Sequence, residues 1–233
     1  MFIKYFKYTL NMKQWNKIFK KKGKYFIKVQ KDIPKFVTLL KKAKAKKILD
    51  LGSGSGRHTV YLTKKGFEVF GIDIAQEGIN ITKDWLKKEN LKADLKIGNI
   101  YKKLPYPNNS FDAIISTGVI CHNNIFGIRK TIKEMERILK PQGFIFINVR
   151  RNRKYTQKLN STKILPFGKE NTLCKITSPR TCVPLEGGEK GLIHYNFTKQ
   201  SLKKEFNNFD NQTIWLGSDK RHLYIIGRLK KPN

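Results

Sequence analysis

Two acidic residues and three glycines stand at a spacing that suits the binding of a nucleoside. Asp50 ends a short apolar run, and Gly52, Gly54 and Gly56 follow at alternate positions. A second apolar run ends in Asp73, 17 residues after the last glycine. Glycine lets the backbone turn sharply and approach a ligand, and an acid at the tip of the next strand can accept hydrogen bonds from ribose hydroxyls. The pattern therefore predicts a site for a nucleoside that carries a polar group.

The glycine spacing also separates two kinds of nucleoside ligand. A dinucleotide site follows the pattern G-x-G-x-x-G, whereas here the third glycine comes one residue early and Arg57 stands where that pattern has glycine. Asp50 would lie close to the pyrophosphate of a dinucleotide, so a ligand with a cationic group suits the site better. A nicotinamide-dependent oxidoreductase remains an alternative function from another class.

The elements around these residues alternate between strand and helix. Apolar runs predict five strands, at residues 46–51, 67–73, 93–98, 111–117 and 144–149. Apolar stripes at helical spacing predict helices at residues 57–65, 76–89 and 125–139, and a helical segment over residues 12–44. Short connections between alternating strands and helices are typical of a doubly wound parallel sheet.

The C-terminal half departs from this alternation. Residues 150–192 are polar and rich in Pro and Gly, which predicts a long irregular insert over the binding site. A short helix is expected to residue 206, followed by strands at 212–216 and 222–229 whose joint is short enough for an antiparallel hairpin.

The acid–glycine motif, the acid after the second strand, and the Ser110-Phe111-Asp112 entry to the fourth strand resemble the class I methyltransferases that use S-adenosylmethionine. The Gly56-Arg57-His58 run and an N-terminal Trp segment are similar to the small-molecule, tellurite-resistance-like sub-group. The resemblance implies an α/β, doubly wound, mostly parallel seven-stranded sheet, a Rossmann-like methyltransferase fold with an antiparallel C-terminal hairpin strand. Residues 1–45 would form a helical cap on a domain of residues 46–233, with the insert on the substrate side.

The resemblance also implies a set of cofactor contacts. The methionine end of the cofactor would lie against Asp50, the loop of glycines and Ser53, while Asp73 would bind the ribose. Ile74 and Ile100 would contact the adenine, and Thr117 would border the sulfonium. Asn99 stands where the family usually has Asp, and its carbonyl oxygen can accept the same hydrogen bond from the adenine amino group.

Candidates for the acceptor side come from outside that motif. A base is needed only if the acceptor carries a proton, and the candidates are His122, His194 and Tyr195. Each also has a structural interpretation, as a loop histidine or as a packing residue. Candidates for the substrate pocket are Trp15, Tyr25, Glu186 and Lys190. No metal-ligand spacing is present, because Cys174 and Cys182 are too far apart for a zinc pair.

The composition of the chain limits which binding partners and which cellular setting we expect. The net charge of +32 comes mostly from lysines spread along the chain. Its cause is either genomic bias or a surface that binds RNA, so an RNA methyltransferase remains an alternative function. Three cysteines give no even disulfide framework and predict a reducing, cytoplasmic setting. No apolar stretch approaches the roughly 18 residues that a membrane span needs. Met1 and Met12 are both candidate starts.

We expect a small-molecule substrate and S-adenosylmethionine as cofactor, and a non-catalytic nucleoside binder remains a further alternative.

Overall fold

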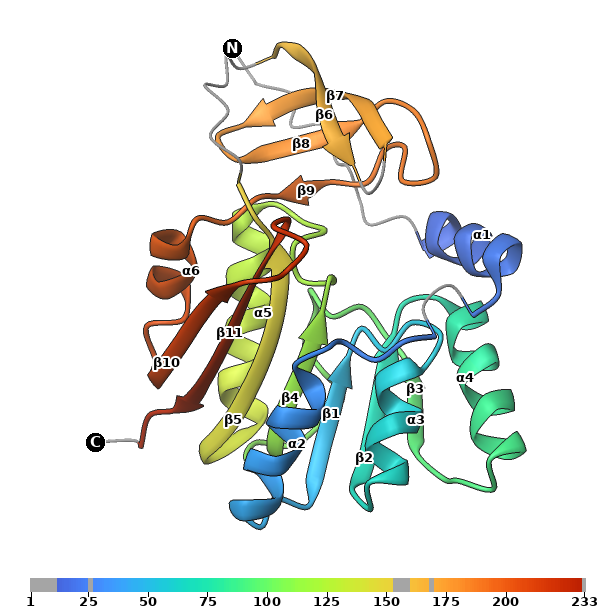
Figure 1. Cartoon of the computed structure of the whole chain (residues 1–233), viewed down its shortest axis with the longest axis vertical. Coiled ribbons are helices and arrows are strands. Elements are labelled where there is room, and N and C mark those ends of the chain that lie inside the picture. The colour runs from blue at the N-terminus through green and yellow to red at the C-terminus, as the bar shows by residue number, and fades with distance from the viewer. Residues whose placement is uncertain (1–11, 25–26, 153–159, 168–169, 232–233) are drawn as a thin grey trace.

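A seven-stranded sheet forms the body of the computed structural model, which describes residues 12–24, 27–152, 160–167 and 170–231 (Figure 1). Its strands are β1 (Lys47–Leu51), β2 (Glu68–Asp73), β3 (Asp94–Ile97), β4 (Phe111–Thr117), β5 (Leu139–Arg150), β10 (Phe209–Leu216) and β11 (His222–Leu229). The helices are α1 (Met12–Lys22), α2 (Ile33–Lys42), α3 (Arg57–Lys64), α4 (Gln76–Lys88), α5 (Ile125–Ile138) and α6 (Lys199–Glu205).

The sheet has the strand order β10-β11-β5-β4-β1-β2-β3. The strands from β5 to β3 are parallel to their neighbours, whereas β11 lies antiparallel between β5 and β10. The chain order reverses between β1 and β4, and ligands of open α/β sheets bind at the carboxyl ends of the strands beside such a reversal. The doubly wound fold and its antiparallel hairpin are thus confirmed.

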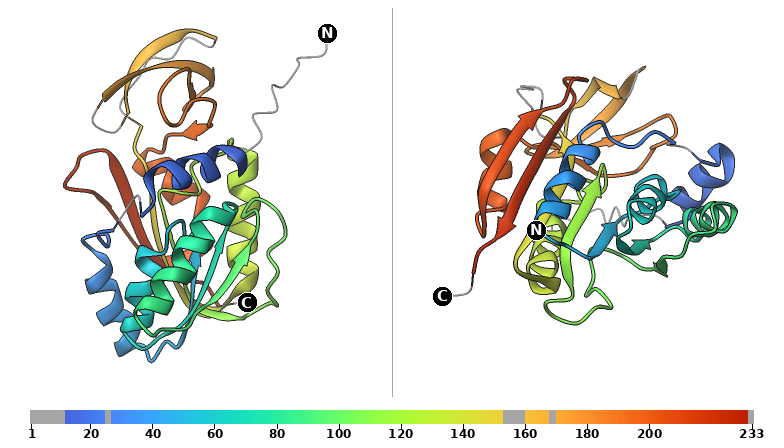
Figure 2. Two further views of the ribbon diagram at one scale, coloured as in Figure 1. Left: turned by 90° about the vertical axis from the view of Figure 1, so that its right-hand side faces the viewer. Right: turned by 60° about the horizontal axis from the view of Figure 1, so that its bottom comes forward.

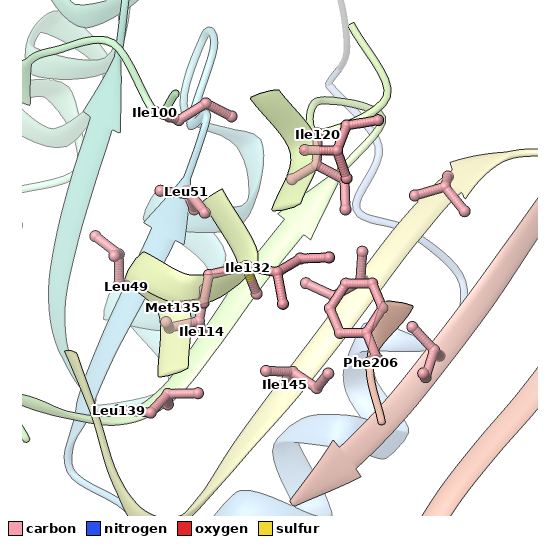
Figure 3. Close-up of a cluster of buried hydrophobic side chains, with 14 of the residues drawn as sticks. Leu49, Leu51, Ile100, Ile114, Ile120, Ile132, Met135, Leu139, Ile145 and Phe206 are labelled. Atoms are coloured by element: carbon pink, nitrogen blue, oxygen red, sulfur yellow. The ribbon is translucent and has the colours of Figure 1, made fainter. Parts of the chain in front are cut away.

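Side chains on the central strands alternate between two apolar cores. Ile114 and Ile145 point to the face covered by α5 and by the end of α6, where Met135 and Phe206 pack (Figure 3). The neighbouring residues of the same strands point to the opposite face, which α2 and α3 cover. Because strands buried on both faces read as continuous apolar runs, the sequence pattern located them well.

Residues 150–192 differ from the irregular insert that the sequence suggested. They contain most of a second, four-stranded sheet, made of β6 (Thr162–Phe167), β7 (Glu170–Ser178), β8 (Thr181–Pro184) and β9 (His194–Tyr195). Its buried side is small and includes Cys174, Ile176 and Cys182. So few apolar residues at alternate positions, interrupted by Pro and Gly, give a weak strand signal.

The second sheet and α1 both lie at the carboxyl edge of the main sheet (Figures 1 and 2). The Tyr195 N–H donates to the Cys121 carbonyl at 2.8 Å, which fixes β9 to the loop after β4. The Gln14 side chain donates to the Gly188 carbonyl at 2.8 Å and so joins α1 to the insert. Within the described residues, no helix is both long and apolar enough to cross a bilayer.

Candidate functional site

A pocket opens where β1 and β4 end, below α1. Its cavity volume is about 90 Å3. The glycine loop after β1 forms its floor, with Asp73 and Ile74 on one side. Trp15 and Phe19 of α1 and His122 of the loop after β4 add aromatic surface to the lining.

The loop between β1 and α3 is tied to the end of β2 by a carboxylate. Asp73 accepts a hydrogen bond from the Gly54 N–H at 2.8 Å and one from the Ala75 N–H at 2.9 Å. Burial raises the pKa of Asp73, and these backbone donors oppose that effect. The carboxylate is 8% exposed and lines the pocket, so it remains within reach of a ligand.

Gly56 is the residue that lets the loop enter α3. Its φ is +87°, and a Cβ there would lie 2.5 Å from the Thr82 Cγ2 of α4. It does not line the pocket itself. Both the left-handed backbone and the close approach of α4 therefore require glycine at this position.

Asp50 lies beneath the loop. It is 2% exposed and accepts a hydrogen bond from the Thr59 hydroxyl at 2.7 Å. Burial raises its pKa to about 6, with Thr59 and Arg57 acting in the opposite direction. Asp50 is not among the pocket-lining residues, so its negative charge acts on the pocket by long-range electrostatics rather than by direct contact.

Two side chains of the first turn of α3 converge on the hydroxyl of Thr117 at the end of β4. The Arg57 Nη2 donates to it at 3.3 Å, and the His58 Nδ1 lies 3.3 Å from it. The His58 Nε2 accepts from the Gln30 N–H at 3.2 Å, which leaves the ring proton on Nδ1. Burial and the charge of Arg57 lower the pKa of His58 well below its ordinary value, so its ring is neutral.

Aromatic rings from α1, from the loop after β4 and from β9 pack against one another at the pocket. The ring of His122 lies 5.1 Å from that of Trp15 and 4.6 Å from that of His194, edge to face in both cases. His194 Nε2 lies 3.2 Å from a carboxylate oxygen of Glu189. The insert therefore places a carboxylate and a second imidazole directly behind the pocket wall.

The remaining candidate residues lie away from the pocket or outside the described residues. The Asn99 carbonyl oxygen accepts from the Tyr101 N–H at 2.9 Å, which leaves it a second lone pair. The Tyr195 hydroxyl lies 3.4 Å from Arg180 Nη1. Glu186 accepts from the Leu173 N–H at 2.8 Å, and Lys190 is not among the lining residues. Tyr25 lies outside the described residues.

The comparisons with known proteins identify the domain that holds this pocket. The family described as a methyltransferase domain matches residues 48–143. The chain carries a class I methyltransferase domain of the S-adenosylmethionine-dependent family. The match spans the glycine loop, Asp73 and Thr117, and it ends before the insert.

The chain also matches part of several curated methyltransferases. It is 34% identical over 101 residues to a demethylmenaquinone methyltransferase of Tropheryma whipplei, which covers 43% of this chain and 40% of that one. It is 33% identical over 101 residues, with the same coverage, to a ubiquinone biosynthesis O-methyltransferase of Pelagibacter ubique. The match thus spans about two fifths of the length of these relatives.

Solved structures share the fold over more of the chain. An S-adenosylmethionine-dependent methyltransferase from Clostridium acetobutylicum superposes with a TM-score of 0.64 at 15% identity, covering 94% of this chain and 98% of that one. TehB from Haemophilus influenzae does so with a TM-score of 0.61 at 20% identity, covering 93% and 67%. At these identities the likeness shows the fold, and the sub-group remains a prediction.

The lining of the methyltransferase pocket fits S-adenosylmethionine, the cofactor of this family. Asp73 presents a carboxylate, and Ile74 and Ile100 present apolar surface. The Ser53 hydroxyl is buried at the pocket and has no hydrogen-bond partner among the described residues. A buried polar atom without a partner is costly, so this hydroxyl suits a polar group of a ligand.

Several pocket residues escaped the sequence analysis. The lining side chains of Arg57, His58, Phe19 and Val119 were not predicted to contact the ligand, and Glu189 was not predicted beside His194. Arg57 and His58 could have been found, because the first turn of a helix after a glycine loop faces the ligand. The described residues contain no group of three potential metal ligands.

Proposed function

We propose that this protein transfers the methyl group of S-adenosylmethionine to a small-molecule acceptor by direct in-line displacement. S-adenosylmethionine supplies a methyl group already activated by its sulfonium. The protein then has to bind both partners, align them and exclude water. The observation that carries the proposal is the pocket itself, which is lined by the glycine loop and by aromatic side chains of α1.

The residues in and below the pocket support the following cofactor contacts. Asp73 would accept hydrogen bonds from the ribose hydroxyls, and Ile74 and Ile100 would pack against the adenine. Ser53 and the backbone of the glycine loop would hold the methionine end. Thr117, fixed by Arg57 and His58, would border the sulfonium, and the buried charge of Asp50 would favour the cationic cofactor from below.

The character of the pocket favours a small acceptor over RNA. Among the described residues that line it, Arg57 is the one cation, and α1 and the insert cover the carboxyl edge of the sheet. An open trough lined with lysines would suit a nucleic acid better. The match to the methyltransferase domain ends at residue 143, before the insert, so the named substrates of the curated relatives do not fix the acceptor of this chain.

Calorimetric titration of the purified protein tests the cofactor assignment. We expect S-adenosylmethionine and S-adenosylhomocysteine to bind at one site and to raise the melting temperature, with a stabilisation of about 2.7 kcal/mol at 100 times the dissociation constant. NAD serves as the control and should leave the melting temperature unchanged. Stabilisation by NAD, with no binding of either methionine derivative, would contradict the proposal.

A screen for S-adenosylhomocysteine formation with small-molecule pools then separates an enzyme from a non-catalytic binder. Total RNA is a parallel arm, tested for affinity at moderate salt because lysine-driven binding weakens steeply as salt rises. Turnover with a small-molecule pool and none with RNA is the expected result. Turnover with RNA alone would replace the acceptor assignment.

A further inference from the structure

The hydroxyl of Thr117 lies between two nitrogen-bearing side chains of α3. The Arg57 Nη2 is 3.3 Å from the Thr117 Oγ1, and the His58 Nδ1 is also 3.3 Å from it. All three residues line the pocket, and the Thr117 side chain is only partly buried, so a ligand in the pocket can reach the hydroxyl. What these two neighbours donate therefore decides what the hydroxyl can offer to that ligand.

His58 is a hydrogen-bond donor to Thr117. Its Nε2 accepts from the Gln30 N–H at 3.2 Å, so that nitrogen carries no proton. The single proton of a neutral imidazole must then lie on Nδ1, the nitrogen that faces Thr117. Burial and the charge of Arg57 lower the pKa of His58, which agrees with a neutral ring.

The Thr117 oxygen thus accepts two hydrogen bonds. A guanidinium has no acceptor atom, so Arg57 also donates to it. Two incoming bonds occupy both lone pairs of a hydroxyl oxygen and leave only its own proton. Among the described residues no atom accepts that proton. Toward a ligand, Thr117 can therefore act only as a donor.

Arg57 adds positive charge beside this donor. Its Nη1 donates to the Lys28 carbonyl at 3.3 Å, which holds the guanidinium against the segment between α1 and α2. Burial lowers the pKa of Arg57 and the charge of Asp50 opposes that effect, but an arginine remains charged at physiological pH. A donor beside a partly desolvated cation favours an anionic oxygen over a neutral one.

The carboxylate of the pocket lies on another strand. Asp73 is the one acidic residue among the described residues that line the pocket, and its carboxylate accepts from the Gly54 and Ala75 N–H groups. Strand β1 separates β2, which ends at Asp73, from β4, which ends at Thr117. Two strand spacings amount to about 10 Å, so an anion at Thr117 need not contact Asp73.

We propose that Thr117 and Arg57 bind a carboxylate group of the methyl acceptor, with His58 as a positioning residue. The inference rests on the proposed function and names the class of its substrate. Thr117 donates its hydroxyl proton to one oxygen of the carboxylate, and Arg57 supplies the opposite charge. The net charge of +32 acts in the same direction, because it attracts small anions and repels small cations.

Titration calorimetry of the S-adenosylhomocysteine complex tests the inference without the natural acceptor. The probes are formate, acetate and benzoate, each compared with its amide at neutral pH and constant ionic strength. We expect at least one carboxylate to bind about tenfold more tightly than its amide. Arg57→Gln should remove this preference. Thr117→Val should weaken carboxylate binding about tenfold, and Thr117→Ser, which keeps the hydroxyl, should not.

Two further variants separate the site from general effects. His58→Phe frees one lone pair of the Thr117 oxygen, so the hydroxyl can turn away from the ligand. We expect the carboxylate preference to fall in this variant while the affinity for S-adenosylhomocysteine stays unchanged. Arg129→Gln removes an arginine that pairs with Glu205 away from the pocket, and it should keep the preference although it lowers the net charge equally.

The outcomes distinguish this inference from the proposed function. Failure of the wild type to bind S-adenosylhomocysteine would overturn the proposed function. Intact binding with no carboxylate preference, or with an equal preference in Arg57→Gln, would overturn this inference alone. Loss of S-adenosylhomocysteine affinity in Thr117→Val, with no carboxylate bound by the wild-type complex, would also overturn it by assigning the hydroxyl to the methionine end of the cofactor. If Arg57→Gln does not fold, equal carboxylate binding by Thr117→Val and Thr117→Ser contradicts the inference.

Discussion

The carboxylate of Asp73 accepts a hydrogen bond from the backbone of Gly54, although the two residues lie 19 positions apart. This bond joins the end of β2 to the glycine loop after β1. The same carboxylate that would contact the ribose therefore also shapes the loop that would hold the methionine end. Cofactor binding and loop geometry would then be coupled through one side chain.

We expect Asp73→Ala to lower the affinity for S-adenosylmethionine about 100-fold, because it removes both the ribose contact and the acceptor for Gly54. That change corresponds to about 3 kcal/mol, the upper range for hydrogen bonds to a charged group. Asp73→Asn keeps one acceptor oxygen and should lose less. Calorimetric titration measures both, and wild-type affinity in Asp73→Ala would contradict the assignment.

Gly56 and Gly66 form a matched pair for testing the close packing of the loop. Their φ angles are +87° and +86°, but a Cβ at Gly66 meets nothing within 4 Å, whereas one at Gly56 meets Thr82. Gly66→Ala should cost about 1 kcal/mol of unfolding free energy from backbone strain alone. Gly56→Ala should cost about 1–3 kcal/mol more because of overpacking. Urea denaturation measures the loss of unfolding free energy in both variants. Equal losses would show that α4 shifts to accommodate the added methyl group.

Asp50 gives the protein a stability that depends on pH. Its folded pKa of about 6 lies above the ordinary value of 3.8, so the folded state binds its proton more tightly than the unfolded chain. Its contribution to stability therefore falls as pH rises from about 4 to about 6, by roughly 3 kcal/mol at most. Asp50→Asn should be more stable than the wild type at pH 8 and nearly equal to it at pH 4.

The same variant tests why a destabilising charge is present. If the buried carboxylate favours a cationic cofactor, Asp50→Asn should bind S-adenosylmethionine more weakly while the melting temperature at pH 8 rises. Affinity for S-adenosylhomocysteine, which lacks the sulfonium charge, should change less. An equal loss for both ligands would point to altered loop geometry rather than to charge.

Trp15 reports on the position of α1. Its ring contacts His122 and lines the pocket, so cofactor binding should change its fluorescence. Trp15→Phe should remove this change, whereas Trp215→Phe, on β10 and stacked on Tyr224, should preserve it. A fluorescence change that persists in Trp15→Phe would show that α1 does not respond to cofactor binding.

The sequence predicted the strands of the main sheet better than it predicted the insert of residues 150–192. Strands such as β1 and β4 are buried on both faces, and their apolar runs end where Asp50 and Thr117 lie, so pattern and position agreed. The pairing of Glu189 with His194 could not be read from spacing, because it depends on the fold of the second sheet. Glu186 was the acid singled out there, and the structure directs it to Leu173 instead.

The second sheet leaves and rejoins the body of the protein at a single place. The Asn152 N–H donates to the Phe197 carbonyl at 2.7 Å, and the Phe197 N–H donates to the Arg150 carbonyl at 2.8 Å. These hydrogen bonds hold the two ends of the segment together. The entropic cost of closing such a loop grows by only about 0.6 kcal/mol for each doubling of its length. Changes in the length of this segment should therefore cost the main sheet little stability.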